Sequence, residues 1–226
     1  ESPANLRALL RIAHPLIADR IDYGRMTAES ASFVLESFRE READLLRRAP
    51  YRSGPGGAER EVWIYLLLEH QSTPDPLMPF RLLLAMTQIW ERERRAQEER
   101  RVPPGEQRLS PIVPIVFYTG RREWTSPGAL DGLVEVPEDL RGFLPRHDTL
   151  FVSVHTDPAE RLTVDDDALG WLLRLLRVEA ESLETVEAIE EKAAEAIRSL
   201  AARGEAERAR VFLRVVIGFV CHRREK

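Results

Sequence analysis

The sequence predicts an α/β fold: a mixed sheet flanked by helices, followed by a C-terminal helical region. Residues 62–68, VWIYLLL, are apolar at odd and even positions alike, which is typical of a central strand covered on both faces. A helical pattern follows, and after it comes a second apolar segment, PIVPIVFYTG, at 111–120. Strand–helix–strand order implies a parallel crossover, and a third strand is predicted at 149–157.

The segments before the central strand predict helices and one hairpin. Apolar residues recur with helical spacing over 4–13, and Pro15 interrupts them. Thr27 is a suitable cap for a second helix, which we expect to run to about Glu36. The following FREREADLLRRAPY either prolongs that helix or forms a short strand around Asp44. The turn residues RSGPGGAE then stand where a hairpin loop would lie, just before the central strand.

The segments after the central strand predict one long helix and further helices toward the C-terminus. Asp75 is a suitable N-cap and Pro76 suits the first helical position, so we expect this helix to run to about Gln97. Its second half, ERERRAQEERR, mixes both signs of charge and indicates a solvated face. The arginines of this face are Arg92, Arg94, Arg95, Arg100 and Arg101. From Asp165 onward the pattern is helical throughout.

Length and composition limit the class of protein. The 226 residues suffice for one domain with a helical appendage, which we place at 1–160 and 161–226. With 43% hydrophobic and 31% charged residues, we expect a globular protein with neither a membrane helix nor a signal peptide. A single cysteine, Cys221, argues against a disulfide framework and fits a cytoplasmic protein. The net charge of −5 argues mildly against nonspecific coating of nucleic acid, without excluding a nuclease.

Two polar residues end the central strand. Glu69 and Gln71 share one face of it, because strand side chains alternate. Asp44, if it lies on a neighbouring strand, could point into the same space. Mg²⁺ prefers oxygen ligands and usually takes only one or two carboxylates, so the three residues could form a metal site. The spacing alone favours the simpler interpretation, in which the strand reaches water at this point.

Two longer motifs carry a family resemblance. One is LLEHQS at 67–72, followed by a short turn with Asp and Pro and by a helix that opens M-x-x-R-L at 78–82. The other is PIVFYTGRREW at 114–124. Together they resemble the Rpn family of recombination-promoting nucleases, whose members are also labelled YhgA-like transposases. The resemblance covers roughly residues 9–124 well and the helical remainder loosely.

The resemblance implies a PD-(D/E)XK nuclease core and metal-dependent endonuclease cleavage of DNA, with Mg²⁺ or Mn²⁺ as cofactor. It carries the two metal-binding, catalytic acids of the family onto Asp44 and Glu69 and the catalytic glutamine onto Gln71, and it places Asp44 on a strand. A further catalytic acid is expected from the helix before the first strand. Glu36 is our choice, with Glu29 and Glu40 as alternatives.

Basic residues near the strand ends are candidates for DNA binding. Arg81 lies on the first turn of the helix after the site and could reach a phosphate, although a salt bridge within the fold is an equal alternative. Arg122 follows the next strand, at the edge where open α/β sheets usually bind ligands. His70 alternates away from Glu69, and we interpret it as a hydrogen-bonded packing residue.

The leading functional prediction is therefore a Mg²⁺-dependent DNA endonuclease with a role in recombination or in mobile-element or phage-defence biology. The alternative is a catalytically weak or inactive module of the same fold that binds DNA or protein. The acidic charge balance and the glutamine in place of the usual lysine favour this alternative somewhat. A third interpretation is a helical interaction protein. In the leading interpretation we expect the C-terminal helices, from about Asp165, to form a homodimer or bind a partner.

Overall fold

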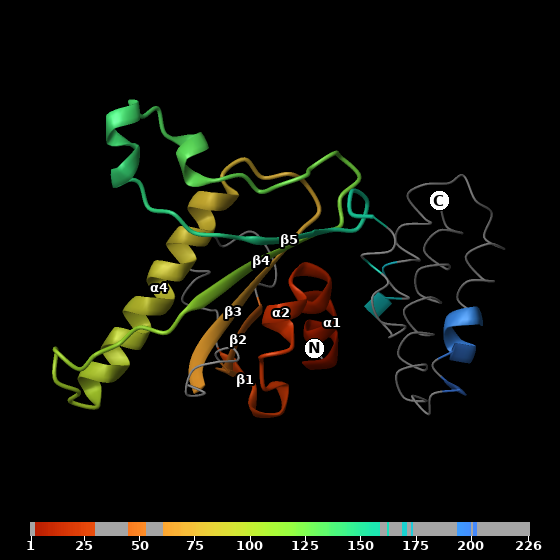
Figure 1. Ribbon diagram of the computed structural model, residues 1–226, viewed down its shortest axis with the longest axis horizontal. Coiled ribbons are helices and arrows are strands. Elements are labelled where there is room, and N and C mark those ends of the chain that lie inside the picture. The colour runs from red at the N-terminus through yellow and green to blue at the C-terminus, as the bar shows by residue number, and fades with distance from the viewer. Residues whose placement is uncertain are drawn as a thin grey trace, which may run out of the picture.

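Five strands form one mixed sheet in the order β1-β2-β3-β4-β5 (Figure 1). The computed structural model describes residues 3–29, 45–52, 61–158, 162, 169–170, 173, 194–199 and 201–202. The strands are β1 (Thr27–Glu29), β2 (Leu45–Arg52), β3 (Glu61–Gln71), β4 (Ile112–Tyr118) and β5 (Leu150–Ser153). Strands β1 to β3 pair antiparallel and strands β3 to β5 pair parallel. The predicted α/β class, the hairpin and the parallel crossover are confirmed.

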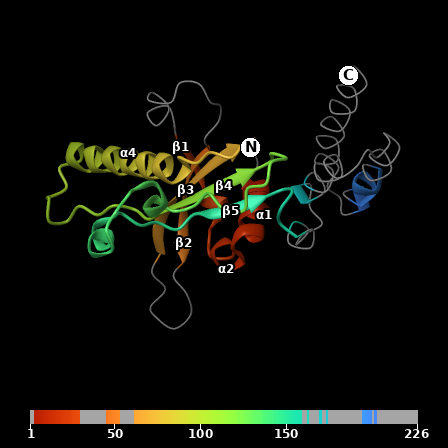
Figure 2. The same ribbon diagram turned by 90° about the horizontal axis from the view of Figure 1, so that it is seen from above.

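The described helices cover both faces of this sheet. They are α1 (Pro3–Ala13), α2 (Pro15–Ala18), α4 (Met78–Glu99) and the 3₁₀ turns η1 (Tyr23–Arg25), η2 (Leu130–Leu133) and η3 (Glu138–Phe143). Figure 2 shows α4 along one face and α1 with α2 against the other. The buried residues of α4 recur every three or four positions, so one stripe of the helix faces the sheet. That stripe consists of Met78, Leu82, Ala85, Met86 and Ile89, with Pro79 beside it.

Strand β3 is central because both of its faces are buried. Ile64 and Leu66 belong to the core beneath α1, whereas Tyr65 and Leu67 belong to the core beneath α4. Strand alternation continues this division, so Glu69 shares the α4 face with Tyr65 and Leu67. The apolar run in the sequence therefore correctly predicted a strand that is buried on both faces. The end of this strand places Glu69 next to the start of α4.

Two predicted helix starts are wrong. Thr27 does not cap a helix, because Thr27–Glu29 is strand β1, and its pairing with β2 satisfies backbone groups that a cap would have served. Helix α4 begins at Met78 instead of following an Asp75 cap, because Asp75 closes a tight turn. The Asp75 Oδ1 atom accepts a hydrogen bond from the backbone nitrogen of Leu77 at 2.9 Å, and the Asp75 carbonyl accepts one from Met78.

Part of the sequence prediction lies outside the described residues. Asp44, Glu36 and Glu40 are among these, as is most of the predicted helical appendage at 161–226. The described positions beyond Pro158 are all helical. Two of them, Leu162 and Leu173, are buried and belong to the core cluster beneath α1. Within the described part of the chain, no helix has the length and apolarity needed to cross a bilayer.

Candidate active site at the end of strand β3

A buried carboxylate marks the end of β3. Glu69 is 3% exposed, and its Oε2 atom lies 3.3 Å from Nη2 of Arg81 in the first turn of α4. The Nη1 atom of the same guanidinium lies 2.7 Å from Oδ2 of Asp75. A carboxylate removed from water needs a compensating charge and hydrogen bonds, and Arg81 supplies both. Arg81 thus bridges two carboxylates, which is the salt-bridge alternative considered for it from the sequence.

The turn between β3 and α4 sets this geometry. Asp75 uses one carboxylate oxygen to fix the backbone ahead of α4 and the other to hold Arg81. The planar guanidinium presents its donors in a fixed fork, so one arginine can serve two acceptors at once. Sequence reasoning assigned Asp75 only a capping role. No spacing signal in the chain indicated that the same side chain would also orient Arg81.

Gln71 lies two residues beyond Glu69 and is 5% exposed. Its backbone carbonyl accepts a hydrogen bond from Thr119 at 2.9 Å, but its side-chain amide makes no hydrogen bond within the described part of the chain. An amide offers one acceptor and two donor hydrogens. Gln71 is therefore held firmly by its backbone while its side chain is available to a ligand or to water.

Tyr118 lies opposite Gln71 on β4 and is completely buried. Its hydroxyl donates to the carbonyl of Arg122 at 2.7 Å, and its ring packs edge-on against Trp124 with centroids 4.9 Å apart. Burial raises the pKa of Tyr118, so the hydroxyl remains a donor at neutral pH. These contacts fold the segment after β4 back onto the end of the sheet.

Gly120 allows the closest approach in this region. A Cβ atom at this position would lie 2.2 Å from the carbonyl oxygen of Ser72 and 2.4 Å from the hydroxyl of Tyr118. Only glycine fits there, so the backbone after β4 packs directly on the backbone after Gln71. In the sequence, Gly120 is only the last residue of the second apolar segment, and no local pattern indicates this role.

Of the other predicted site residues, some lie in the described part of the chain and some outside it. Asp44, Glu36 and Glu40 lie outside the described residues, although Leu45, which follows Asp44 in the chain, pairs with Leu68. Glu29 is paired with Arg92 at 3.2 Å and does not contact Glu69. Arg122 is exposed beyond the end of β4. Among the described residues, no three His, Cys, Asp or Glu side chains gather as a metal-ligand group.

His70 faces the opposite side of the sheet from Glu69. Its Nε2 atom lies 2.9 Å from Oγ1 of Thr119, and its ring lies 5.8 Å from that of Phe117. The hydrogen bond agrees with the interpretation of His70, but the residue is exposed, so its packing is limited to the contact with Phe117.

Replacing Arg81 with methionine is expected to lower the free energy of unfolding by about 3 kcal/mol, because it leaves two carboxylates without their shared cation in a largely buried site. Replacing Arg95, whose pair with Glu91 is exposed, is expected to change it by less than about 0.5 kcal/mol. Urea unfolding of both variants measures the difference. Equal destabilisation by the two replacements would show that the Arg81 bridges are not important for stability.

Comparison with known proteins places these observations in context. Residues 2–205 match the family described as "Putative transposase, YhgA-like". The chain is 31% identical over 121 residues to "Recombination-promoting nuclease RpnD" of Escherichia coli O157:H7, which is 53% of this chain and 42% of that protein. It is 32% identical over 99 residues to "Recombination-promoting nuclease RpnA" of Escherichia coli K12, covering 44% of this chain and 29% of that protein.

A shorter relative shares the same region. "Putative inactive recombination-promoting nuclease-like protein YjiP" of Escherichia coli K12 is 35% identical over 82 residues, covering 36% of this chain and 74% of that protein. The chain spans less than half the length of the two longer relatives. No solved structure matches the chain.

Proposed function

The chain belongs to the family described as "Putative transposase, YhgA-like", and from this premise we propose that it is a metal-dependent endonuclease that hydrolyses phosphodiester bonds in DNA. The observation that carries the proposal is Glu69, a carboxylate that is 3% exposed at the end of a central strand. It lies on the same face as the Gln71 amide, which makes no side-chain hydrogen bond with the described residues. The names of two relatives, both recombination-promoting nucleases, support the reaction class and a role in recombination.

We further propose that the core is of the PD-(D/E)XK type. The antiparallel hairpin of β2 and β3, the crossover helix α4 and the parallel strand β4 follow one another in the order expected for such a core. In that arrangement the site lies where the central strand β3 ends. The buried Glu69 occupies this end, which agrees with the proposal.

A divalent cation such as Mg²⁺ fits the donors at this site. Glu69 offers a carboxylate and Gln71 an amide oxygen, and Mg²⁺ usually takes only one or two protein carboxylates. Asp44 is the second proposed ligand: it precedes Leu45 in the chain, and Leu45 pairs with Leu68, the neighbour of Glu69. When bound, the ion would lower the pKa of a water molecule and stabilise negative charge on the phosphate.

The residues around Glu69 have separate proposed roles in water orientation and phosphate binding. The side-chain carbonyl of Gln71 can accept a hydrogen bond from the attacking water, and its NH₂ group can donate to a phosphate oxygen. Glutamine cannot remove a proton from that water, so Gln71 orients the water and does not act as a base. The guanidinium of Arg81 can turn from Glu69 toward phosphate when a cation binds the carboxylate. Arg122, exposed beyond β4, is a second proposed phosphate contact.

Cleavage of supercoiled plasmid DNA tests the proposal. Wild-type protein is incubated with Mg²⁺ or Mn²⁺ and with EDTA, beside Asp44→Asn and the matched surface variant Asp148→Asn. We expect nicking that needs the metal, is lost in Asp44→Asn and is retained in Asp148→Asn. Equal nicking by all three proteins, or undiminished nicking in EDTA, would contradict the proposal.

Gln71→Met is expected to separate activity from stability. The variant keeps the length of the side chain but removes an amide that has no hydrogen bond within the described part of the chain. We expect the free energy of unfolding to stay unchanged or rise by up to about 1 kcal/mol, while the cleavage rate falls at least about 10-fold. Thermal unfolding and plasmid cleavage measure the two quantities. A variant that loses stability and activity in parallel would indicate a structural role for Gln71.

A second candidate function is a binding module with the same fold and no catalysis. The observation that favours it is the Arg81 bridge, which already neutralises Glu69 without a metal ion. The name of one relative, an inactive nuclease-like protein, points the same way. Calorimetric titration with Mg²⁺ and Mn²⁺ distinguishes the two candidates. Binding that Glu69→Gln weakens supports the nuclease, whereas heats that do not exceed dilution up to millimolar metal support the module.

We also propose that the C-terminal helices, from about Asp165, mediate a homodimer or bind a partner. Size-exclusion chromatography of the full chain at two concentrations tests the homodimer directly. A monomeric mass at both concentrations leaves partner binding as the role to examine.

A further inference from the structure

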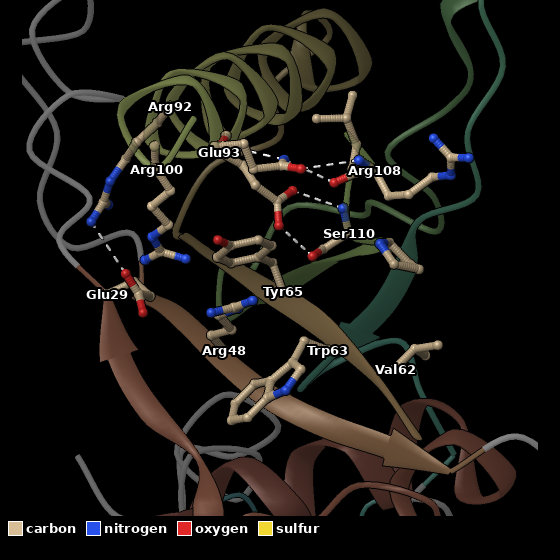
Figure 3. A pocket seen from close by; sticks show the side chains of 14 residues that line it. Glu29, Arg48, Val62, Trp63, Tyr65, Arg92, Glu93, Arg100, Arg108 and Ser110 are labelled. Carbon is tan, nitrogen blue, oxygen red and sulfur yellow. Dashed lines mark hydrogen bonds and ion pairs between the residues drawn. The ribbon is translucent and has the colours of Figure 1, made fainter. Parts of the chain in front are cut away.

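A cavity of about 520 Å³ opens at the other end of α4 from Glu69, on the same face of the sheet (Figure 3). Its size lies within the range of ordinary small-molecule pockets. Its walls come from β1, β2, β3, the end of α4 and residues 108–111. We define the arginine pocket by Arg48, Trp63, Tyr65, Arg92 and Arg100. From Trp63 to Glu69 strand β3 advances roughly 20 Å at about 3.3 Å per residue, so this pocket is separate from the candidate active site.

Arg48 is the central cation of the arginine pocket. It is half-buried, and its guanidinium carbon lies 4.8 Å from the centroid of the Trp63 ring and 5.7 Å from that of Tyr65. Figure 3 shows it between the two rings. Its Nε atom is buried without a hydrogen-bond partner, and within the described part of the chain no carboxylate pairs with it. Aromatic faces compensate a guanidinium only partly, so among the described residues this charge has no paired carboxylate.

Two more donors on the walls are also unused. The side chains of Arg100 and Tyr65 make no hydrogen bond or ion pair with the described residues. Figure 3 shows the Tyr65 hydroxyl directed to the side of the pocket on which the Arg100 guanidinium lies. Burial raises the pKa of Tyr65, so its hydroxyl keeps the proton at neutral pH. The sequence pattern does not indicate this arrangement, because Arg100 falls in a run of mixed charge, which is typical of a solvated face.

The acidic residues of the pocket do not balance its arginines. Glu93 accepts hydrogen bonds from the backbone nitrogen and the hydroxyl of Ser110, which are neutral groups. Glu29 is paired with Arg92 at 3.2 Å. The lining has four arginines, Arg48, Arg92, Arg100 and Arg108, against these two glutamates, so two positive charges remain in excess among the described residues and a bound anion would balance them.

We propose that the arginine pocket binds the phosphate group of a small molecule, either inorganic phosphate or a nucleoside monophosphate. Arg48 and Arg100 are the binding cations, and Tyr65 is a third donor. Phosphate suits this set because it carries more than one negative charge near neutral pH and accepts hydrogen bonds from several directions, whereas a carboxylate accepts in one plane. The proposal does not depend on nuclease activity, since neither Glu69 nor a metal ion takes part.

Isothermal titration calorimetry tests the proposal on the full chain in EDTA, with inorganic phosphate and with adenosine monophosphate in separate titrations. We expect a dissociation constant at or below about 1 mM for at least one of them. Arg100→Gln and Arg48→Lys are each expected to weaken binding at least about 10-fold, as the loss of a charge-assisted hydrogen bond requires. Arg48→Lys keeps the charge and tests the need for the guanidinium fork.

Arg95→Gln is the matched control, because it removes the same charge from the last turns of α4, just before Arg100, at an exposed site where the side chain pairs with Glu91. We expect Arg95→Gln to bind the ligand within about twofold of wild type. If the loss of one positive charge acted only through the long-range, salt-screened field, Arg95→Gln and Arg100→Gln would weaken binding equally. Tighter binding of the nucleotide than of phosphate identifies a nucleotide site, and equal binding identifies a phosphate site. The proposal is overturned if neither phosphate nor adenosine monophosphate saturates the protein. It is also overturned if Arg95→Gln and Arg100→Gln weaken ligand binding equally.

Discussion

Glu69→Gln is expected to reduce metal-dependent DNA cleavage at least about 100-fold while leaving the fold intact. The replacement keeps the shape of a side chain that is 3% exposed and removes only its charge, which the proposed cation requires. Arg81 keeps its 2.7 Å pair with Asp75, so the guanidinium is not left without a counter-ion. Single-turnover cleavage of a plasmid, with circular dichroism of the same sample, measures both parts of the prediction.

Glu91→Gln is the control for Glu69→Gln. Glu91 is also a glutamate paired with arginine, but it lies on the exposed side of α4. The same chemical change at Glu91 is expected to leave cleavage within about twofold of wild type, since exposed pairs contribute little. If Glu69→Gln cleaves DNA at the wild-type rate, the buried carboxylate takes no part in the reaction and the proposed function fails.

Gly120→Ala is expected to lower the free energy of unfolding by about 4 kcal/mol, an exceptional value for one methyl group. The added Cβ would lie 2.2 Å from a backbone oxygen of Ser72, and a backbone atom cannot turn aside as a side chain does. It would also meet the hydroxyl of Tyr118, which is fully buried. For a chain of this length the melting temperature should fall by roughly 8–16 °C, and cleavage should fall with it because Gln71 would shift.

Gly142→Ala provides the comparison for Gly120→Ala. A Cβ at Gly142 meets no atom within 4 Å, and its backbone shows no left-handed conformation. That variant is expected to melt within about 2 °C of wild type. Differential scanning calorimetry decides the matter. Similar melting temperatures for the two variants would mean that the backbone after β4 can move away from Ser72 at little cost.

The sequence could predict the centre of the fold because the centre follows from local patterns. Residues 62–68 are apolar on both faces, and such a short run, rich in β-branched and aromatic residues, is typical of a strand between two cores. The pairing of β3 with β4 follows from the intervening helix, since a parallel crossover needs one. Glu69 and Gln71 share a face because side chains alternate between the two faces of a strand. These predictions needed no information from distant parts of the chain.

The remaining features depend on contacts between segments far apart in sequence. Thr27 carries a good capping signal, yet edge pairing with Arg48 makes it the start of β1. Arg100 sits in a charged run, and only the packing of α4 over β3 brings it beside Tyr65. The role of Gly120 depends on Ser72, which reaches it only once β3 and β4 are paired. Local propensity does not contain such information, because tertiary pairing decides between competing local states.

The bridge from Arg81 to Glu69 and Asp75 also bears on the order in which the molecule is assembled. Because the cation that neutralises Glu69 belongs to the chain itself, the site can close during folding without waiting for an ion from solution. For the metal-dependent nuclease proposed above, folding and metal loading would then be independent events, unlike in small proteins whose fold exists only with metal bound. Such a protein would fold where free metal is scarce and would become active only when the ion and DNA are both bound.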